Sequence, residues 1–214
     1  SDFFIGAYYG NGLDNRNITR LPFQPDMVTV KRSGATGGAF RTSAHAGDLS
    51  SYFAATAEAA NIVQSLTTDG FQIGTAANVN TAAGVYHFFA FKSGTNFEVG
   101  TYSGTGVAKN VPVAFQPNNI WVKSTVATRG VARASSQAGD GAIPFINIAS
   151  LTNAITAIIA SGFSIGTAAE TNTSGTNNYR YVAWKNNSTP STPVYKMQTG
   201  SYVGSGSAKS ITGL

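Results

Sequence analysis

The stretch GFQIGTAA at residues 70–77 returns 92 positions later as GFSIGTAA at residues 162–169. The same offset relates Phe23-Gln24-Pro25 to Phe115-Gln116-Pro117. An internal repeat of this length decides the architecture, because each copy is expected to fold as one supersecondary or domain unit. The sequence therefore predicts two copies of one domain in tandem, with Phe23 and Phe115 at equivalent buried positions.

The openings of the copies give the domain boundaries. The segment YYGNG at residues 8–12 matches YSGTG at residues 102–106, and a third version, YVGSG, follows at residues 202–206. An aromatic segment that ends in lysine closes each of the first two copies. We expect three units: repeat 1 at residues 1–97, repeat 2 at residues 98–194, and the opening strand of a partial third repeat at residues 195–214.

Within each copy the expected elements are short and rich in strand-forming residues. Met27–Lys31 and Asn119–Lys123 each follow a proline that favours a turn. Asp69-Gly70 lies between two apolar runs and predicts a hairpin, which Ser161-Gly162 preserves in the second copy. The structure of the alanine-rich segment at residues 53–60 is ambiguous, and a short helix is one possibility. The pattern predicts an all-β fold with two tandem β-sandwich, jelly-roll-like domains plus a C-terminal orphan strand.

The composition fits a β-protein that packs against other protein or carbohydrate. Charged residues make up 11% of the chain and hydrophobic residues 42%. The absence of cysteine excludes disulfides, thiolate metal sites and thiol nucleophiles. No run approaches 18 apolar residues, so we expect no membrane insertion. Residues 1–4 lack the basic-then-apolar pattern of a signal peptide.

The net charge of +5 comes from the second half of the chain. From Gly100 onward there are eight lysines and arginines against two acids, Asp140 and Glu170. A basic half can face nucleic acid, anionic glycan or an acidic protein surface. These bases are too sparse to follow a phosphate backbone, so no nucleic-acid partner is expected.

The two histidines argue against catalysis, because neither is repeated. Gln137 aligns with His45, and Tyr179 or Arg180 aligns with His87. A duplicated catalytic unit would be expected to repeat its base. His87 lies in an aromatic strand, where we expect a packed imidazole. The chain is therefore expected not to be an enzyme, and no catalytic residues are predicted.

No metal or cofactor site is predicted either. Asp48 and Asp140 form the one repeated acidic position, and each follows Ala-Gly in a setting typical of a turn held by a bond to backbone. Hard cations need several oxygens close together, which a single acid does not supply. Residues 204–210 resemble a phosphate loop but lack its Gly-Lys pair.

Four aromatic residues are candidate contacts for a glycan or a protein partner: Tyr102, Trp121, Trp184 and Tyr202. An exposed ring binds sugar by stacking on its apolar face. The competing interpretation places these rings in the core, because alternation along a strand buries most aromatic residues.

The chain resembles a domain of tail-fibre and other virion proteins of tailed bacteriophages. The resemblance rests on FQPDMVTVK at residues 23–31, DGFQIG at residues 69–74, VNT at residues 79–81 and the closing aromatic strand. That domain is often arrayed in tandem after a Gly-Thr-Tyr-x-Gly-x-Gly opening, as at residues 100–106. Thr29 departs from the usual tryptophan, which Trp121 supplies, and Asn118 departs from the usual aspartate. These motifs are structural and imply a virion component.

We therefore expect a non-enzymatic structural component of a bacteriophage virion, either a tail-fibre or appendage module or a capsid-surface decoration module. Its expected partners are other virion proteins, further copies of itself and a host-surface glycan. Two alternatives remain open: a cellular surface filament subunit or adhesin, and a carbohydrate-binding module. Residues 195–214 are expected to pair with a sheet edge, either that of repeat 2 or that of another subunit.

Overall fold

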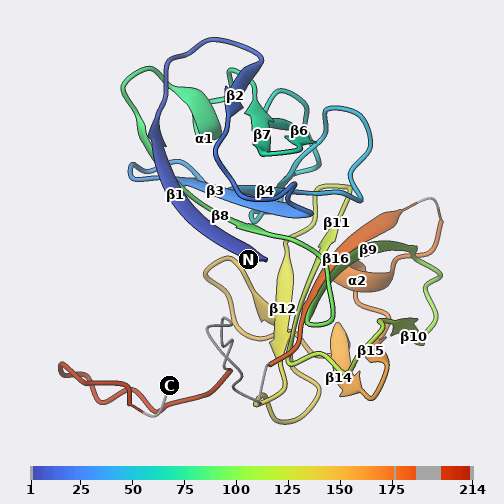
Figure 1. Cartoon of the computed structure of the whole chain (residues 1–214). Helices are drawn as coiled ribbons and strands as arrows, with labels where there is room; N and C mark the ends of the chain where they lie inside the picture. Colours follow the sequence, from blue (N-terminus) through green and yellow to red (C-terminus); the bar gives the residue numbers. More distant parts are fainter. Residues whose placement is uncertain (1, 176, 187–198, 213–214) are drawn as a thin grey trace.

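The computed structural model describes residues 2–175, 177–186 and 199–212, which form two sandwiches of eight strands each (Figure 1). The first contains β1 (Phe3–Tyr9), β2 (Arg16–Ile18), β3 (Met27–Arg32), β4 (Ala39–Thr42), β5 (Ser51–Tyr52), β6 (Val63–Thr67), β7 (Gly70–Ile73), α1 (Ala77–Asn80) and β8 (Val85–Phe91). The second contains β9 (Phe97–Ser103), β10 (Lys109–Pro112), β11 (Asn119–Ser124), β12 (Val131–Ala134), β13 (Ile143–Pro144), β14 (Ile155–Ile159), β15 (Gly162–Ile165), α2 (Ala169–Asn172) and β16 (Asn178–Trp184).

The two sandwiches share one topology. In the first, a five-stranded sheet of order β1-β8-β3-β4-β5 faces a three-stranded sheet of order β2-β7-β6. In the second, the orders are β9-β16-β11-β12-β13 and β10-β15-β14, so each strand occupies the place of its counterpart. Every pairing in these sheets is antiparallel, and the prediction of two tandem β-sandwiches is confirmed.

The closing aromatic strands are central in their sheets. β8 pairs with both β1 and β3, and β16 pairs with both β9 and β11. Alternation along β8 points Tyr86, Phe88 and Ala90 into the core between the sheets. The predicted hairpins join β6 to β7 and β14 to β15.

Each sandwich has its own apolar core between its two sheets. In repeat 1 that core includes Val28, Phe71 and Tyr86, and in repeat 2 it includes Ile120 and Phe163. Phe23 and Phe115 lie in the two cores with the same exposed fraction, 7%. The equivalence of these two positions follows the prediction.

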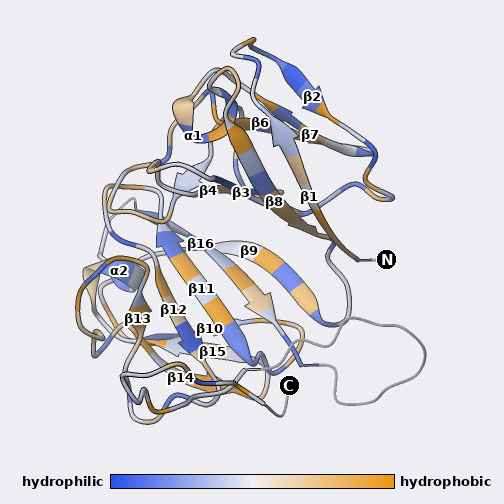
Figure 2. Cartoon of the chain, turned by 90° about the vertical axis from the view of Figure 1, so that its left-hand side faces the viewer, coloured by the Kyte–Doolittle hydropathy of each residue, from blue (hydrophilic) through white to orange (hydrophobic). Residues whose placement is uncertain are grey.

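The five-stranded sheets of the two repeats pack against each other, so the molecule is a stack of four sheets (Figure 1). A third apolar cluster fills the contact between the repeats. Because β3 is covered on both faces, all four residues from Met27 to Val30 are buried. Figure 2 shows the same stack from the side, with polar and apolar residues alternating along β9 and β11.

Two sequence expectations differ from the structure, and the structure settles one segment that the sequence left undecided. Residues 53–60 form bends and an isolated bridge at Ala59 in place of a helix, because they lie against repeat 2. His87 is exposed and bonds Ser33 Oγ at 3.1 Å, since its side chain lies on the face of β8 away from the core. Residues 199–212 contain no strand, and residues 200–212 are exposed. The rest of the expected orphan strand, residues 195–198 and 213–214, lies outside the described residues.

Candidate functional site: the interface between the repeats

Aromatic rings from both repeats form the centre of the interface. The Phe53 ring lies 5.5 Å from that of Trp121 and 5.1 Å from that of Phe145, centroid to centroid. Trp184 packs 4.7 Å from Trp121 and 5.8 Å from Phe91. Edge-to-face pairs at these distances stabilise an interface beyond the area they bury.

Equivalent residues of the two repeats touch each other across this interface. Phe53 corresponds to Phe145, and Phe91 corresponds to Trp184, and both pairs are in contact. Contact between equivalent positions is the mark of an isologous, two-fold-like interface, and simple head-to-tail stacking does not produce it. The two repeats therefore pack face to face, as a homodimer would, within one chain.

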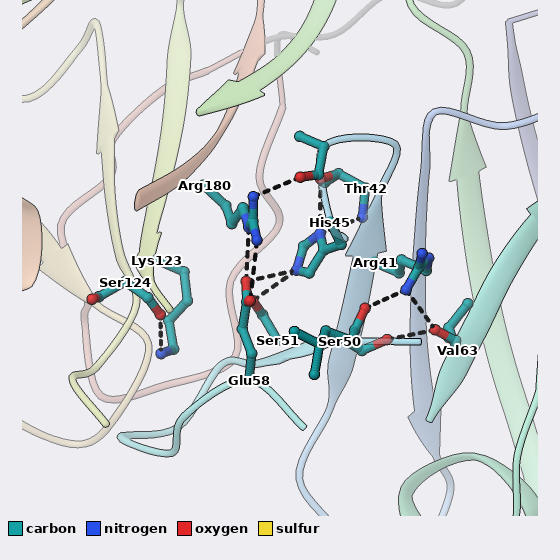
Figure 3. Close-up of polar contacts among 12 residues, drawn as sticks. Arg41, Thr42, His45, Ser50, Ser51, Glu58, Val63, Lys123, Ser124 and Arg180 are labelled. Atoms are coloured by element: carbon teal, nitrogen blue, oxygen red, sulfur yellow. Dashed lines mark hydrogen bonds and ion pairs between the residues drawn. The ribbon is translucent and has the colours of Figure 1, made fainter. Parts of the chain in front are cut away.

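A charged cluster also joins the two repeats (Figure 3). Arg180 of β16 donates two hydrogen bonds to Glu58 of repeat 1, from Nε to Oε1 at 2.8 Å and from Nη2 to Oε2 at 3.1 Å. Its Nη1 donates to the Ala44 carbonyl at 2.5 Å. We call Glu58, Arg180, His45 and Ser51 the Glu58 cluster. The Glu58 side chain is only 4% exposed and that of Arg180 11%, so this is a buried, bidentate ion pair between the repeats.

His45 completes the cluster as a neutral hydrogen-bond donor. Its Nδ1 accepts the Thr42 backbone N–H at 3.0 Å, which places the ring proton on Nε2. Nε2 faces Ser51 Oγ at 2.9 Å and Glu58 Oε1 at 3.2 Å. Burial lowers the pKa of His45 to about 3, and the positive charges of Arg180 and Arg41 act in the same direction. The attraction of Glu58 opposes this shift without reversing it.

The geometry of Ser51, His45 and Glu58 excludes a hydrolytic triad. In a triad, the serine and the carboxylate contact opposite ring nitrogens, so that the nitrogen beside the serine can accept its proton. Here both contact Nε2, which carries the hydrogen, and backbone occupies Nδ1. Ser51 therefore has no base, and the side chains of His45 and Glu58 are almost fully buried. The cluster joins the two repeats and has no catalytic arrangement.

The remaining charges of the interface are also satisfied. Burial raises the pKa of Glu58, but hydrogen bonds and charge from Arg180, with help from His45, hold it below its ordinary value. Lys123 is 1% exposed and donates to the carbonyls of Ser124 and Val126 at 2.8 and 3.1 Å. Its burial lowers its pKa to about 8, against the attraction of Glu58. Its counterpart Lys31 makes the same local bonds on the surface.

The four predicted contact residues lie in three different environments. Trp121 and Trp184 belong to the interface cluster, so they contact the other repeat of the same chain. Tyr102 stacks on Tyr179 and donates to the Thr171 carbonyl at 2.8 Å, and Lys109 lies over its ring. These three rings therefore pack within the protein. Tyr202 is 69% exposed and free for an external partner.

Sequence reasoning missed the Glu58 cluster, although a signal for it was present. Glu58 and Arg180 are 122 residues apart. Glu58 also lies in residues 53–60, whose secondary structure the sequence did not decide. The residues of the cluster differ between the repeats. Glu58 aligns with Ser150 at the repeat offset. Arg180 is equivalent to His87, because Arg180 pairs with Lys123 and His87 pairs with the equivalent Lys31. These residues are not repeated because they form a single contact, the one between repeat 1 and repeat 2.

The repeated acids brace loops at equivalent places. Both carboxylate oxygens of Asp48 accept from the Asn61 backbone N–H, at 3.0 and 3.1 Å. Asp140 does the same with Asn153, at 3.3 and 3.2 Å. The predicted bond to backbone is present, but it reaches 13 residues along the chain and is not a local turn bond. Within the described residues, no three His, Asp or Glu side chains gather as a metal site.

Repeat 1 also has a pocket of about 270 Å³ on its own surface, lined by Gln24, Pro25, Asp26, Arg41, Ser43, Gly47, Gln64, Ser65 and Leu66. Two buried polar atoms at this pocket, Arg41 Nε and Gln64 Oε1, have no hydrogen-bond partner. In repeat 2, Thr156 and Asn118 stand in place of Gln64 and Asp26.

Comparison with known protein families, curated proteins and solved structures finds no match to this chain. In the described ranges, no helix is long and apolar enough to span a membrane.

Proposed function

We propose that this chain is a non-enzymatic structural component of a bacteriophage virion, a tail-fibre or appendage module or a capsid-surface decoration module. The observation that carries the structural role is the interface between the repeats, where aromatic packing and the Glu58 cluster join two sandwiches into one unit. The assignment to a virion is supported by the resemblance of residues 23–31 and 69–74 to phage tail-fibre domains.

A unit of this kind serves assembly because its shape is fixed. Two sandwiches joined by a flexible linker would reorient, whereas a buried ion pair and interlocking rings hold one arrangement. Glu58 and Arg180 are paired inside the contact, where neither is open to a substrate. The chain therefore acts through protein–protein or host-surface contacts at its outer faces.

Quantitative mass spectrometry of purified phage particles and of host envelope fractions tests this proposal. We expect the chain to co-purify with particles in fixed proportion to the other virion proteins. An antibody against repeat 2 should decorate a constant site on imaged particles. Recovery of the chain in host surface filaments, with none in particles, would contradict the proposal and favour the filament or adhesin alternative.

Binding of a glycan is a second candidate function, favoured by the pocket beside Arg41. A sugar hydroxyl both donates and accepts, so a hydroxyl-rich ligand suits a pocket whose lining includes Gln24, Asp26, Arg41 and Gln64. A glycan array should then show binding that Gln64→Ala removes. Thr156→Ala, at the equivalent position of repeat 2, is the matched control and should leave binding unchanged. Equal binding by both variants, or none by the parent chain at high concentration, rejects this role.

A further inference from the structure

The exposed C-terminal segment reproduces the opening segment of repeat 2 without a gap. Residues 200–211 read GSYVGSGSAKSI, and residues 100–111 read GTYSGTGVAKNV, with six of twelve positions identical. The identical positions include the tyrosine, three glycines and the lysine. In the described structure a hydrogen bond between Ser135 Oγ and Thr199 Oγ1 at 3.3 Å ties the start of this segment to repeat 2.

In the two complete sandwiches, the opening segment closes one side of the fold. β9 pairs with β16 in the five-stranded sheet, and β10 pairs with β15 in the three-stranded sheet. β1 and β2 make the same pairings with β8 and β7. One short segment thus supplies an edge strand to both sheets of its sandwich.

Docking of an opening segment depends on a tyrosine and a glycine that the C-terminal segment retains. Tyr8 and Tyr102 each donate to a buried carbonyl at 2.8 Å and stack on a second tyrosine. At Gly10 and Gly104 a side chain would start only 2.1 Å from the carbonyl oxygen of Thr81 or Thr173. The corresponding residues are Tyr202 and Gly204, although nothing lies within 4 Å of a Cβ at Gly204. The present surroundings of Gly204 therefore give no steric reason for a glycine at this position.

The C-terminal segment shares two local features with the docked opening segment of repeat 2. Gly12, Gly106 and Gly206 share a φ of +73°, a left-handed conformation that favours glycine. Lys209 Nζ donates to the Val203 carbonyl at 3.2 Å, as Lys109 donates to Ser103 at 2.5 Å. A segment that holds its bound conformation in advance loses less conformational entropy on binding.

The same segment exposes the side chains that its counterparts bury. Tyr202 is 69% exposed and Ile211 is 45% exposed. In the complete sandwiches Tyr8 of repeat 1 is 9% exposed, Val111 of repeat 2 is 2% exposed, and Tyr102 is partly buried. Burying these two apolar side chains favours docking by the hydrophobic effect, and the edge strands gain main-chain hydrogen bonds.

We propose that residues 200–211 dock into an acceptor sandwich of this same fold, pairing with its strands equivalent to β16 and β15 and placing Tyr202 and Ile211 in its core. Both described sandwiches already have this position filled by their own opening segments, so the acceptor is a further sandwich of this fold. This inference rests on the proposed structural function, because it names the partner through which the protein would assemble. Its argument depends on contacts within this chain, so it can fail while the virion assignment holds.

Grafting tests whether the segment fits an acceptor at all. Residues 200–211 replace residues 100–111 in the full chain through T101S, S103V, T105S, V107S, N110S and V111I. We expect the grafted chain to unfold cooperatively within a few degrees of the parent Tm. Tyr102→Ala should lower the Tm of the graft and of the parent chain by similar amounts, because its ring packs on Tyr179 in both. A graft that does not fold overturns the proposal.

Association in trans tests docking directly. Removing residues 1–19 from the full chain vacates the opening position of repeat 1, so the C-terminal segment of one copy finds an acceptor in the next. Sedimentation velocity should show mass rising with concentration. Gly204→Val should abolish this association, because its side chain would meet a backbone carbonyl only in the docked state. Ser207→Val is the matched control, since Val107 is 68% exposed at the equivalent docked position.

Equal association of the Gly204→Val and Ser207→Val chains, or no association of the truncated chain, overturns the proposal. The association result counts only for a truncated chain that folds. If that chain does not fold, the graft alone tests the proposal: a folded graft supports it and an unfolded graft overturns it. Neither experiment depends on where the protein is found, so the virion assignment is tested separately.

Discussion

At the scale of single residues, His45 makes the stability of the protein sensitive to acid. Its pKa is about 3 in the folded protein against 6.5 in the unfolded chain, so the unfolded chain binds the proton first. The stability is intact above about pH 6.5 and is lost as the pH falls toward 3. At pH 5 this loss amounts to about 2 kcal/mol, at 1.4 kcal/mol per pH unit.

Urea unfolding of the parent chain and of His45→Gln at pH 7.5 and pH 5 measures this effect. Glutamine is the residue that repeat 2 has at the equivalent Gln137, and it does not titrate. The variant should lose clearly less stability between the two pH values. Glu58 adds its own loss only below about pH 4.5, its ordinary pKa, because its folded pKa is lowered. An identical loss in both proteins would contradict the assigned role of His45.

Removing the carboxylate of the Glu58 cluster leaves Arg180 buried without a counter-charge. Glu58→Gln is therefore expected to lower the free energy of unfolding by about 3–5 kcal/mol. Arg129→Gln breaks the more exposed ion pair between Arg129 and Glu170 and should cost at most about 1 kcal/mol. Denaturant melts of both variants check the contrast, and equal losses would show that the cluster is not a buried connection.

At the scale of elements, strands and hairpins could be predicted because their determinants are local. Turn chemistry at Asp69-Gly70 and Ser161-Gly162 produced the hairpins β6–β7 and β14–β15. The structure of residues 53–60 and 199–212 could not be predicted in this way, because it depends on what each segment packs against. Glu58 and Arg180 could not be paired either, since a separation of 122 residues leaves no local pattern.

The equivalence of the two repeats predicts equal costs for equivalent core changes. Phe115→Ala and Phe23→Ala each remove a ring that is 7% exposed and should each cost about 3–5 kcal/mol. Val107→Ala, at a position 68% exposed, is the control and should change stability by less than about 0.5 kcal/mol. Chemical denaturation measures all three. A cost below 1 kcal/mol at either phenylalanine would remove that residue from the core.

At the scale of the whole molecule, the repeats form one closed pair. Each uses the outer face of its five-stranded sheet, and equivalent residues such as Phe53 and Phe145 meet across the contact. A third sandwich cannot join the stack by the same face, because both copies of that face are already covered. Growth beyond the pair therefore needs a different contact, for which the exposed segment at residues 200–211 is the proposed candidate.

Differential scanning calorimetry of the full chain tests the face-to-face pairing most directly. If the two sandwiches are one cooperative unit, they unfold in one transition, and the calorimetric enthalpy equals the van't Hoff enthalpy, a ratio of about one. Two sandwiches that are merely tethered would unfold independently, either in two resolved transitions or in one with a ratio of about two. A ratio of about one supports the pairing through Trp184 and the Glu58 cluster, and a ratio of about two contradicts it.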